Sequence, residues 1–250
     1  MQPTQTDHIA AGEIASLAGE RLLALRSEGL SGADLKDAGD SSSEALIADE
    51  LARRFPDDAV LSEEGVDDAA RLSTRRVWII DPLDGTREYS EPPRTDWAVH
   101  VALVIDGQVA AGAVALPARA MTLATGGNLP KRAAYDGPPR VVVSRTRPTE
   151  HALVVADHLG GVLVHMGSAG AKAMAVVLGE ADVYAHSGGQ FEWDSAAPVA
   201  VAASAGLHVS RLDGSPLEYN RADPWLPDVL ICRQDLAAAV IERCAGSGGE

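Results

Sequence analysis

Cysteine is nearly absent from this 250-residue sequence, and long apolar runs are missing. The two cysteines, Cys232 and Cys244, are too few for a disulfide framework and lack a Cys-x-x-Cys spacing, so we expect reduced, structural thiols. No stretch approaches the roughly 20 apolar residues of a membrane-spanning helix. The N-terminal segment contains no basic region followed by an apolar run. These absences predict a cytoplasmic protein with no membrane partner.

Positive charge is also scarce. The chain has 36 acidic and 21 basic residues and a formal net charge of −15, which argues against sequence-independent binding to nucleic acid or anionic lipid. An anionic ligand must therefore meet locally arranged cations. Lysine occurs only at Lys36, Lys131 and Lys172, so Lys36 and Lys172 are candidates for ligand binding.

The first half of the sequence predicts helices beside a sheet. Apolar residues at helical spacing indicate a helix over about 7–28. The Ser-x-x-Glu pattern at 41–44 has the form of a capping box and predicts that a second helix begins there and ends at Pro56. Strands are predicted at 60–61, 77–80, 97–105, 109–116 and 121–124. We expect these strands to form an antiparallel sheet.

Strands and helices alternate in the second half. We predict strands at 141–143, 162–165 and 181–184, helices at 149–159, 168–178 and 194–205, and a further strand after them. Such alternation indicates a layered α/β lobe. The predicted boundary lies at Gly137-Pro138-Pro139, which gives an N-terminal lobe over 1–137 and a C-terminal lobe over 138–250.

Two aspartates follow the apolar strand at 77–80. Asp81 and Asp84 flank Pro82, which bends the backbone so that both carboxylates can face one point. The Leu83 carbonyl is a third oxygen ligand, because it is not consumed by a strand ladder. Oxygen ligands without His or Cys select Mg²⁺ or Mn²⁺ rather than zinc. The N–H groups of the next residues, Gly85 and Thr86, are placed to meet an anion.

A plainer interpretation of this segment is turn chemistry, because Asp-Pro and Asp-Gly are common turn pairs. Two further acidic segments weigh against it. Glu63 ends a short apolar strand, and Asp194 begins a helix of small residues, although a solvated strand end and an N-cap would explain each of them alone. The combination predicts a metal site.

Three segments resemble the signature of the inositol monophosphatase superfamily: Ser-Glu-Glu at 62–64, Trp-Ile-Ile-Asp-Pro-Leu-Asp-Gly-Thr at 78–86 and Trp-Asp-Ser-Ala-Ala at 193–197. The resemblance spans most of the chain. It implies the α+β fold of that superfamily and of fructose-1,6-bisphosphatase, a layered αβαβα sandwich. It also implies a lithium-sensitive phosphatase that uses two or three Mg²⁺ ions, for which Mn²⁺ can substitute.

The resemblance also implies roles for individual residues. The metal ligands would be Glu63, Asp81, Leu83 through its carbonyl, Asp84 and Asp194. Thr86 and Asp40 would orient the attacking water, which is held beside Glu63. The Thr-x-x-Asp that is usual in the superfamily reads Lys36-Asp37-Ala38-Gly39-Asp40 here, and we expect Asp40 on the loop before the second helix. Hydrolysis would be direct, without a phosphoenzyme.

Other segments resemble one branch of the superfamily, the 3′-phosphoadenosine 5′-phosphate phosphatases. These segments are Thr-Arg-Glu-Tyr at 86–89, Val-Ser-Arg at 143–145 and Leu-Glu-Tyr-Asn-Arg at 217–221. They imply hydrolysis of the 3′-phosphate of that nucleotide to AMP in sulfur assimilation, with the sulfated nucleotide as a second candidate substrate. The residues expected to contact substrate are Lys36, Gly85, Thr86, Arg87, Ser144, Arg145, Gly167, Ser168, Lys172, Tyr219 and Arg221.

Several alternatives stay open. Each predicted substrate-binding cation has an alternative role on a solvated face. None of the seven histidines has ligand spacing, so we interpret all of them, including His100 on a strand, as structural or surface residues. Within enzymes the alternatives are inositol monophosphatase and fructose-1,6-bisphosphatase. A non-catalytic nucleotide or sugar-phosphate sensor is an alternative of another class. A homodimer is expected because members of the superfamily often dimerise.

Overall fold

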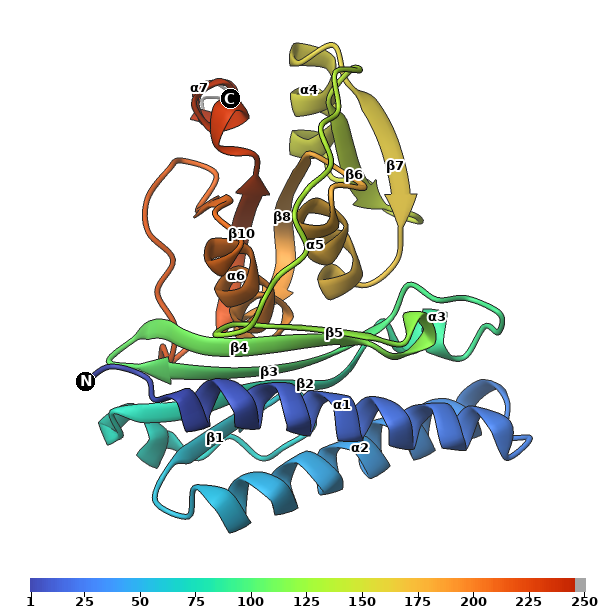
Figure 1. Cartoon of the computed structure of the whole chain (residues 1–250), viewed down its shortest axis with the longest axis vertical. Helices are drawn as coiled ribbons and strands as arrows, with labels where there is room; N and C mark the ends of the chain where they lie inside the picture. The colour runs from blue at the N-terminus through green and yellow to red at the C-terminus, as the bar shows by residue number, and fades with distance from the viewer. Residues whose placement is uncertain (246–250) are drawn as a thin grey trace.

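The computed structural model describes residues 1–245 and has five layers (Figure 1). Helices α1 and α2 cover one face of a first sheet, α5 and α6 fill the space between the two sheets, and α4 and α7 cover the outer face of the second sheet. The predicted layered αβαβα sandwich is thereby confirmed.

The elements have the following bounds. The helices are α1 Gln5–Ser27, α2 Gly32–Arg54, α3 Thr86–Tyr89, α4 Glu150–His158, α5 Ala169–Leu178, α6 Glu192–Ser204 and α7 Ala237–Ala245, with 3₁₀ helices η1 Ala69–Ser73, η2 Pro117–Arg119 and η3 Gln234–Leu236. The strands are β1 Ala59–Ser62, β2 Arg76–Asp84, β3 Ala98–Ile105, β4 Gln108–Leu116, β5 Met121–Ala124, β6 Arg140–Ser144, β7 Val162–Met166, β8 Val183–Phe191, β9 His208–Ser210 and β10 Trp225–Cys232.

The first sheet has the strand order β1-β2-β3-β4-β5. Pairing is antiparallel from β2 to β5, as predicted, but β1 and β2 are parallel, so the prediction of a wholly antiparallel sheet is wrong. The reason is the connection between them. After β1 the chain passes through η1 before β2 begins, and a crossover of this length brings the next strand back in the same direction.

Helix α2 begins at Gly32 and not at the serine cluster, so the predicted start was wrong. The serines at 41–43 lie inside the helix, and each hydroxyl group has a hydrogen-bond partner. Ser41 Oγ donates to the Asp37 carbonyl one turn earlier, and buried Ser43 Oγ donates to the Pro82 carbonyl at 2.7 Å. As a consequence Asp40 lies within α2 rather than on a loop before it.

The second sheet has the order β7-β6-β8-β10-β9 and combines parallel pairs with antiparallel ones. The predicted alternation of strands and helices is confirmed, although β8 extends to Phe191 and the terminal helix α7 was not predicted. The first sheet ends at Ala124 and the second begins at Arg140. The division into two lobes at residue 137 stays a prediction.

The outer core lies between the second sheet and helices α4 and α7. Cys232 and Cys244 are both buried there and are not bonded to each other. Among the described residues, no helix combines the length and apolar character needed to cross a membrane. The middle layer bears on function, since the first residues of α5 and α6 contact the ends of β2 and β3.

Candidate active site

Three aspartates converge where β2 meets the middle layer. Asp81 and Asp84 lie at the end of β2, and Asp194 lies in the first turn of α6. Each contributes one carboxylate oxygen to a cluster in which all the oxygens lie within 4.8 Å of one another. We call these three residues the aspartate triad. A set of crowded carboxylates with little access to water suits a hard metal cation.

An irregularity in β2 aims two of these carboxylates at one point. Asp81 pairs with His100 and Asp84 pairs with Ala98, so the register of β2 against β3 shifts between the two aspartates. Pro82 lies in this bulge, and its carbonyl accepts from Ser43 instead of from a neighbouring strand. The proline therefore interrupts the ladder at the position where the sequence predicted it.

Glu63 follows β1 and reaches the triad from the neighbouring strand. Its backbone N–H donates to the Ile80 carbonyl at 3.4 Å, which places its carboxyl group where the charges of the triad act on it. Burial, followed by the charge of Asp194, raises the pKa of Glu63 to about 7. Burial and the charge of Glu63 likewise raise the pKa of Asp81 well above its usual value. The carboxylates repel one another, so a bound cation would relieve the repulsion.

The pKa of Asp84 is shifted in the opposite direction from those of Glu63 and Asp81. Burial opposes its ionisation, but the charge of His100, whose ring contacts the carboxylate, with further contributions from Ser168 and Lys172, lowers its pKa to about 2. Its carboxylate also accepts from Ser168 Oγ, and from the backbone N–H groups of Ala169 at 3.0 Å and Gly170 at 2.6 Å. Asp84 therefore stays ionised and binds the beginning of α5.

The sequence did not indicate that His100 contacts the triad. The ring is fully buried, with Nε2 3.2 Å from Asp84 Oδ2 and Nδ1 3.0 Å from the Trp193 carbonyl. Gly170 permits this packing, because a Cβ at that position would lie 2.0 Å from His100 Nε2. The contact could have been predicted only from the pairing of β2 with β3, which places His100 opposite Asp81. His100 is structural, as predicted, but it acts on the triad.

Thr86 and Asp40 form a second polar pair beside the triad. Thr86 Oγ1 lies 3.4 Å from Asp40 Oδ1 and 3.1 Å from the Leu83 carbonyl oxygen. Burial and the charge of Glu64 raise the pKa of Asp40 to about 6. Lys36 lies one turn earlier on α2, where its charge favours the ionised form of Asp40.

Gly85 occupies the tight turn between Asp84 and Thr86. Its φ of 84° is in the left-handed region, and a Cβ there would lie 2.9 Å from the Cβ of Ser168. The contact brings α3 close to the first residues of α5. A side chain at this position would separate the two halves of the site.

Three of the expected substrate-binding residues lie together next to the triad. Gly167 donates its N–H to Asp96, and Ser168 caps α5 while its hydroxyl donates to Asp84. Lys172 is buried, with its Nζ 2.6 Å from the Ser168 carbonyl oxygen and 5.5 Å from the centre of the Tyr184 ring. Burial lowers the pKa of Lys172, against the charge of Asp84. No described carboxylate forms a direct ion pair with this lysine.

Arg145 lies at the junction between α3 and the end of β6. Its guanidinium contacts Glu88 Oε1 at 2.8 Å and Glu91 Oε2 at 3.2 Å. Neighbouring Ser144 accepts a hydrogen bond from the Arg147 N–H, and Arg87 on α3 is exposed. The structure thus brings Arg145 next to Glu88, the residue that favoured a nucleotide substrate.

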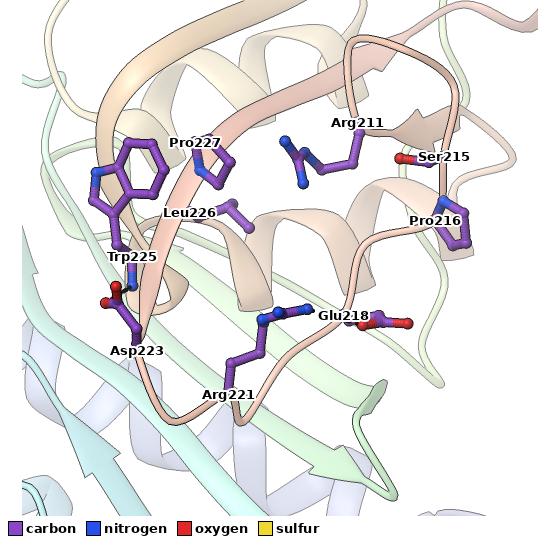
Figure 2. A pocket seen from close by; sticks show the side chains of 9 residues that line it. All are labelled: Arg211, Ser215, Pro216, Glu218, Arg221, Asp223, Trp225, Leu226 and Pro227. Carbon is purple, nitrogen blue, oxygen red and sulfur yellow. Dashed lines mark hydrogen bonds and ion pairs between the residues drawn. The ribbon is translucent and has the colours of Figure 1, made fainter.

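Tyr219 and Arg221 are not joined to the triad by the described contacts. Tyr219 is buried with its hydroxyl 3.2 Å from Ser195 Oγ, and the Arg221 guanidinium pairs with Glu218 at 3.0 Å. Arg221 lines a surface cavity of about 470 Å³ (Figure 2). The residues around this cavity are Arg211, Ser215, Pro216, Glu218, Arg221, Asp223, Trp225, Leu226 and Pro227, and none of the triad is among them.

The fold and the carboxylate cluster can be compared with known proteins. Residues 4–243 match the inositol monophosphatase family, and the chain belongs to that family. It is 49% identical to a 3′-phosphoadenosine 5′-phosphate phosphatase of Mycobacterium leprae, over 96% of this chain and 94% of the relative. It is 32% identical to the 3′(2′),5′-bisphosphate nucleotidase CysQ of Escherichia coli, over 76% of this chain and 81% of the relative.

Solved structures agree with this assignment. CysQ from Bacteroides thetaiotaomicron superposes with a TM-score of 0.78 and 28% identity, covering 92% of this chain and 98% of that one. The inositol monophosphatase from Anabaena superposes with a TM-score of 0.77 and 24% identity, covering 97% and 96%. The second likeness shows the fold alone.

Proposed function

We propose that this chain is a metal-dependent phosphatase that removes the 3′-phosphate of 3′-phosphoadenosine 5′-phosphate, as a bisphosphate nucleotidase. The relatives at 49–50% identity are named for this substrate, and they align over 90% or more of the chain. The observation that carries the proposal is the aspartate triad, because it lies beside a hydroxyl–carboxylate pair, Thr86 and Asp40. A sensor without turnover has no use for that pair.

The donor set fits Mg²⁺, with Mn²⁺ as a substitute. Asp81, Asp84 and Asp194 would hold the metal, together with Glu63 and the Leu83 carbonyl, and all five ligands are oxygen atoms. When bound, Mg²⁺ supplies positive charge to the phosphate oxygens and lowers the pKa of a coordinated water. The crowded, repelling carboxylates of the triad support this assignment.

Thr86 and Glu63 would position the nucleophilic water. If the Thr86 hydroxyl donates to Asp40 or to the Leu83 carbonyl, its oxygen is free to accept a hydrogen bond from water. The Glu63 carboxylate accepts the second hydrogen bond of the same water. Both protons of the water would then be held, which leaves a lone pair free to attack phosphorus.

Two cations are suited to the phosphate that is not cleaved. Lys172 lies behind Ser168 without a direct carboxylate partner, and Arg145 is oriented by Glu88 at the edge of the site. Charge-assisted hydrogen bonds to a phosphate give both affinity and orientation. A substrate with a second phosphate would engage both cations, whereas a monophosphate leaves both without a phosphate to bind. Lys36, Arg87 and Ser144 remain predicted substrate contacts.

Phosphate release from 3′-phosphoadenosine 5′-phosphate tests the proposal. The purified protein should release phosphate in the presence of Mg²⁺, lose this activity on chelation and regain it when Mg²⁺ is restored. The Glu63→Gln and Asp194→Asn variants should each be inactive while retaining the wild-type far-ultraviolet circular dichroism spectrum. Turnover that persists in excess chelator, or in the Asp194→Asn variant, would show that the triad does not carry the reaction.

A further inference from the structure

Glu192 lies two residues before Asp194 on α6 but faces the opposite way. Its carboxylate accepts the backbone N–H of Asn220 through Oε2 at 2.6 Å, and that of Arg221 through Oε1 at 2.8 Å. Residues two apart on a helix point in different directions, so Glu192 binds this loop while Asp194 faces the triad. Glu192 is 1% exposed, so water cannot replace either hydrogen bond.

The backbone of the loop is shaped to receive this carboxylate. Asn220 has φ of 58°, in the left-handed region that few residues other than glycine adopt. Successive N–H groups around such a residue form a concave anion-binding nest. The Arg221 side chain turns away toward the surface cavity while its N–H stays on Glu192 (Figure 2). In this motif the backbone, rather than the guanidinium, makes the buried contact.

Arg71 on η1 holds the same loop from its other side. Its guanidinium donates to the Asn220 side-chain oxygen at 2.8 Å and to the Arg221 carbonyl at 2.9 Å, and it pairs with Asp67 at 2.6 Å. Asn220 in turn donates to the Arg71 carbonyl at 3.1 Å. Arg71 is 1% exposed, which is unusual for an arginine and indicates a structural link.

The link connects two segments that contribute to the site. Arg71 lies on the connection that follows Glu63, and Glu192 lies in the same first turn as Asp194. The Tyr219 hydroxyl adds a contact to Ser195 in that turn, at 3.2 Å. A chain of partly buried hydrogen bonds therefore runs from η1 through Asn220 to the start of α6. The Asp194 carboxylate itself accepts only from the Phe191 N–H, at 2.7 Å, among the described contacts.

We infer that Glu192 is a positioning residue that fixes the first turn of α6 so that Asp194 completes the metal site, with Arg71 and the Asn220 nest as its support. This inference rests on the proposed function, since it assigns a role toward the metal. Groups that orient a ligand from behind change metal affinity or activity by roughly 10–100-fold when they are replaced. The Tyr-Asn-Arg segment at 219–221 then acts by holding α6.

Direct Mn²⁺ binding, measured from the electron paramagnetic resonance signal of the free ion, tests the inference without substrate. The Glu192→Gln variant sets an amide NH₂ against a backbone N–H and should bind Mn²⁺ about 10-fold more weakly than the wild type. In the Asp194→Asn background the same substitution should leave the residual affinity unchanged, because no carboxylate remains to be positioned. Glu218→Gln, on the exposed part of the same loop, is the control and should bind Mn²⁺ as the wild type does.

The Mn²⁺-binding results test the role of Glu192 and the proposed function separately. Wild-type Mn²⁺ affinity in a folded Glu192→Gln protein would overturn the inference, and so would an equal loss in both backgrounds. If Glu192→Gln does not fold, Mn²⁺ binding is measured on the Arg71→Lys variant instead. This variant weakens the support of the loop, because an ammonium cannot reproduce the geometry of the guanidinium. Weaker Mn²⁺ binding by Arg71→Lys supports the inference, and wild-type binding overturns it. A wild-type protein that binds no Mn²⁺ would contradict the proposed function itself.

Discussion

The carboxylate of Asp84, at the end of β2, accepts a hydrogen bond of 2.6 Å from the backbone N–H of Gly170, in the first turn of α5. One side chain of the aspartate triad thus holds the middle layer against the first sheet. The arrangement of the triad and the packing of the two sheets around it are therefore not independent. Changes in the triad will alter stability as well as activity.

The Asp84→Asn variant should lose both catalytic activity and stability. Removing a metal ligand should lower kcat/KM about 1,000-fold, because several kcal/mol of transition-state charge stabilisation is lost. The free energy of unfolding should fall by about 1–3 kcal/mol, since the amide cannot accept from all the donors around it. Steady-state kinetics and urea unfolding check these values, with exposed Asp223→Asn as the control. Wild-type Mg²⁺-dependent turnover by Asp84→Asn would refute the metal assignment.

Thr86→Val tests the positioning of water. Valine keeps the shape of threonine and removes the hydroxyl group, so kcat should fall about 100-fold while KM changes little. Initial rates over a range of substrate concentrations distinguish the two parameters. Thr95→Val, on an exposed loop, is the matched control. A rise in KM with unchanged kcat would assign Thr86 to substrate binding instead.

Asp40 should set an acidic limit to activity. Its pKa is raised to about 6, first by burial and then by the charge of Glu64, so its carboxylate accepts the Thr86 hydroxyl above that pH and is protonated below it. The rate should therefore fall as pH decreases through about 6. Replacing Glu64 by Gln removes a neighbouring negative charge, lowers the pKa of Asp40 and should move the acidic limb of the pH–rate profile to lower pH. A profile that moves to higher pH would contradict this assignment.

The Arg145→Ala substitution should affect the KM for the nucleotide and the KM for inositol 1-phosphate differently. A charge-assisted hydrogen bond contributes roughly 1.5–3 kcal/mol, so KM for 3′-phosphoadenosine 5′-phosphate should rise about 10-fold or more. KM for inositol 1-phosphate should change little, because that substrate has no second phosphate. Arg147→Ala removes an exposed cation from the same turn and serves as the control. Equal effects on both substrates would mean that Arg145 does not recognise the nucleotide.

The order of residues predicted the fold and the acidic cluster because both are encoded locally. The Asp-Pro-Leu-Asp segment supplies two carboxylates and the bulge that aims them. The start of α2 was mispredicted because Ser41–Glu44 has the form of a capping box, whereas Ser43 uses its hydroxyl for a contact with Pro82 that only the folded chain provides. The parallel pairing of β1 with β2 likewise depends on the path of η1, which has no local signature.

Long-range packing accounts for the remaining differences between the predictions from the sequence and the structure. His100 looked like an ordinary strand residue, because only the register of β3 against β2 brings it to the triad. Arg221 was predicted to contact substrate from the resemblance of residues 217–221 to the nucleotide phosphatases, and this role stays a prediction. The sequence did not indicate that its backbone N–H binds Glu192 or that its side chain lines a surface cavity. The homodimer and the cytoplasmic location stay predictions.

The rate of phosphate release from three substrates, compared in one preparation of the wild-type protein with Mg²⁺, tests the central claim most directly. The substrates are 3′-phosphoadenosine 5′-phosphate, myo-inositol 1-phosphate and fructose 1,6-bisphosphate, each measured with and without lithium. We predict that kcat/KM is at least about 10-fold higher for the nucleotide than for myo-inositol 1-phosphate, because Arg145 and Lys172 would bind a second phosphate that the inositol phosphate lacks. Fructose 1,6-bisphosphate also has two phosphates, so its lower kcat/KM would show that the adenosine is recognised as well. A higher kcat/KM for either sugar phosphate would retain the metal site and contradict the nucleotidase function.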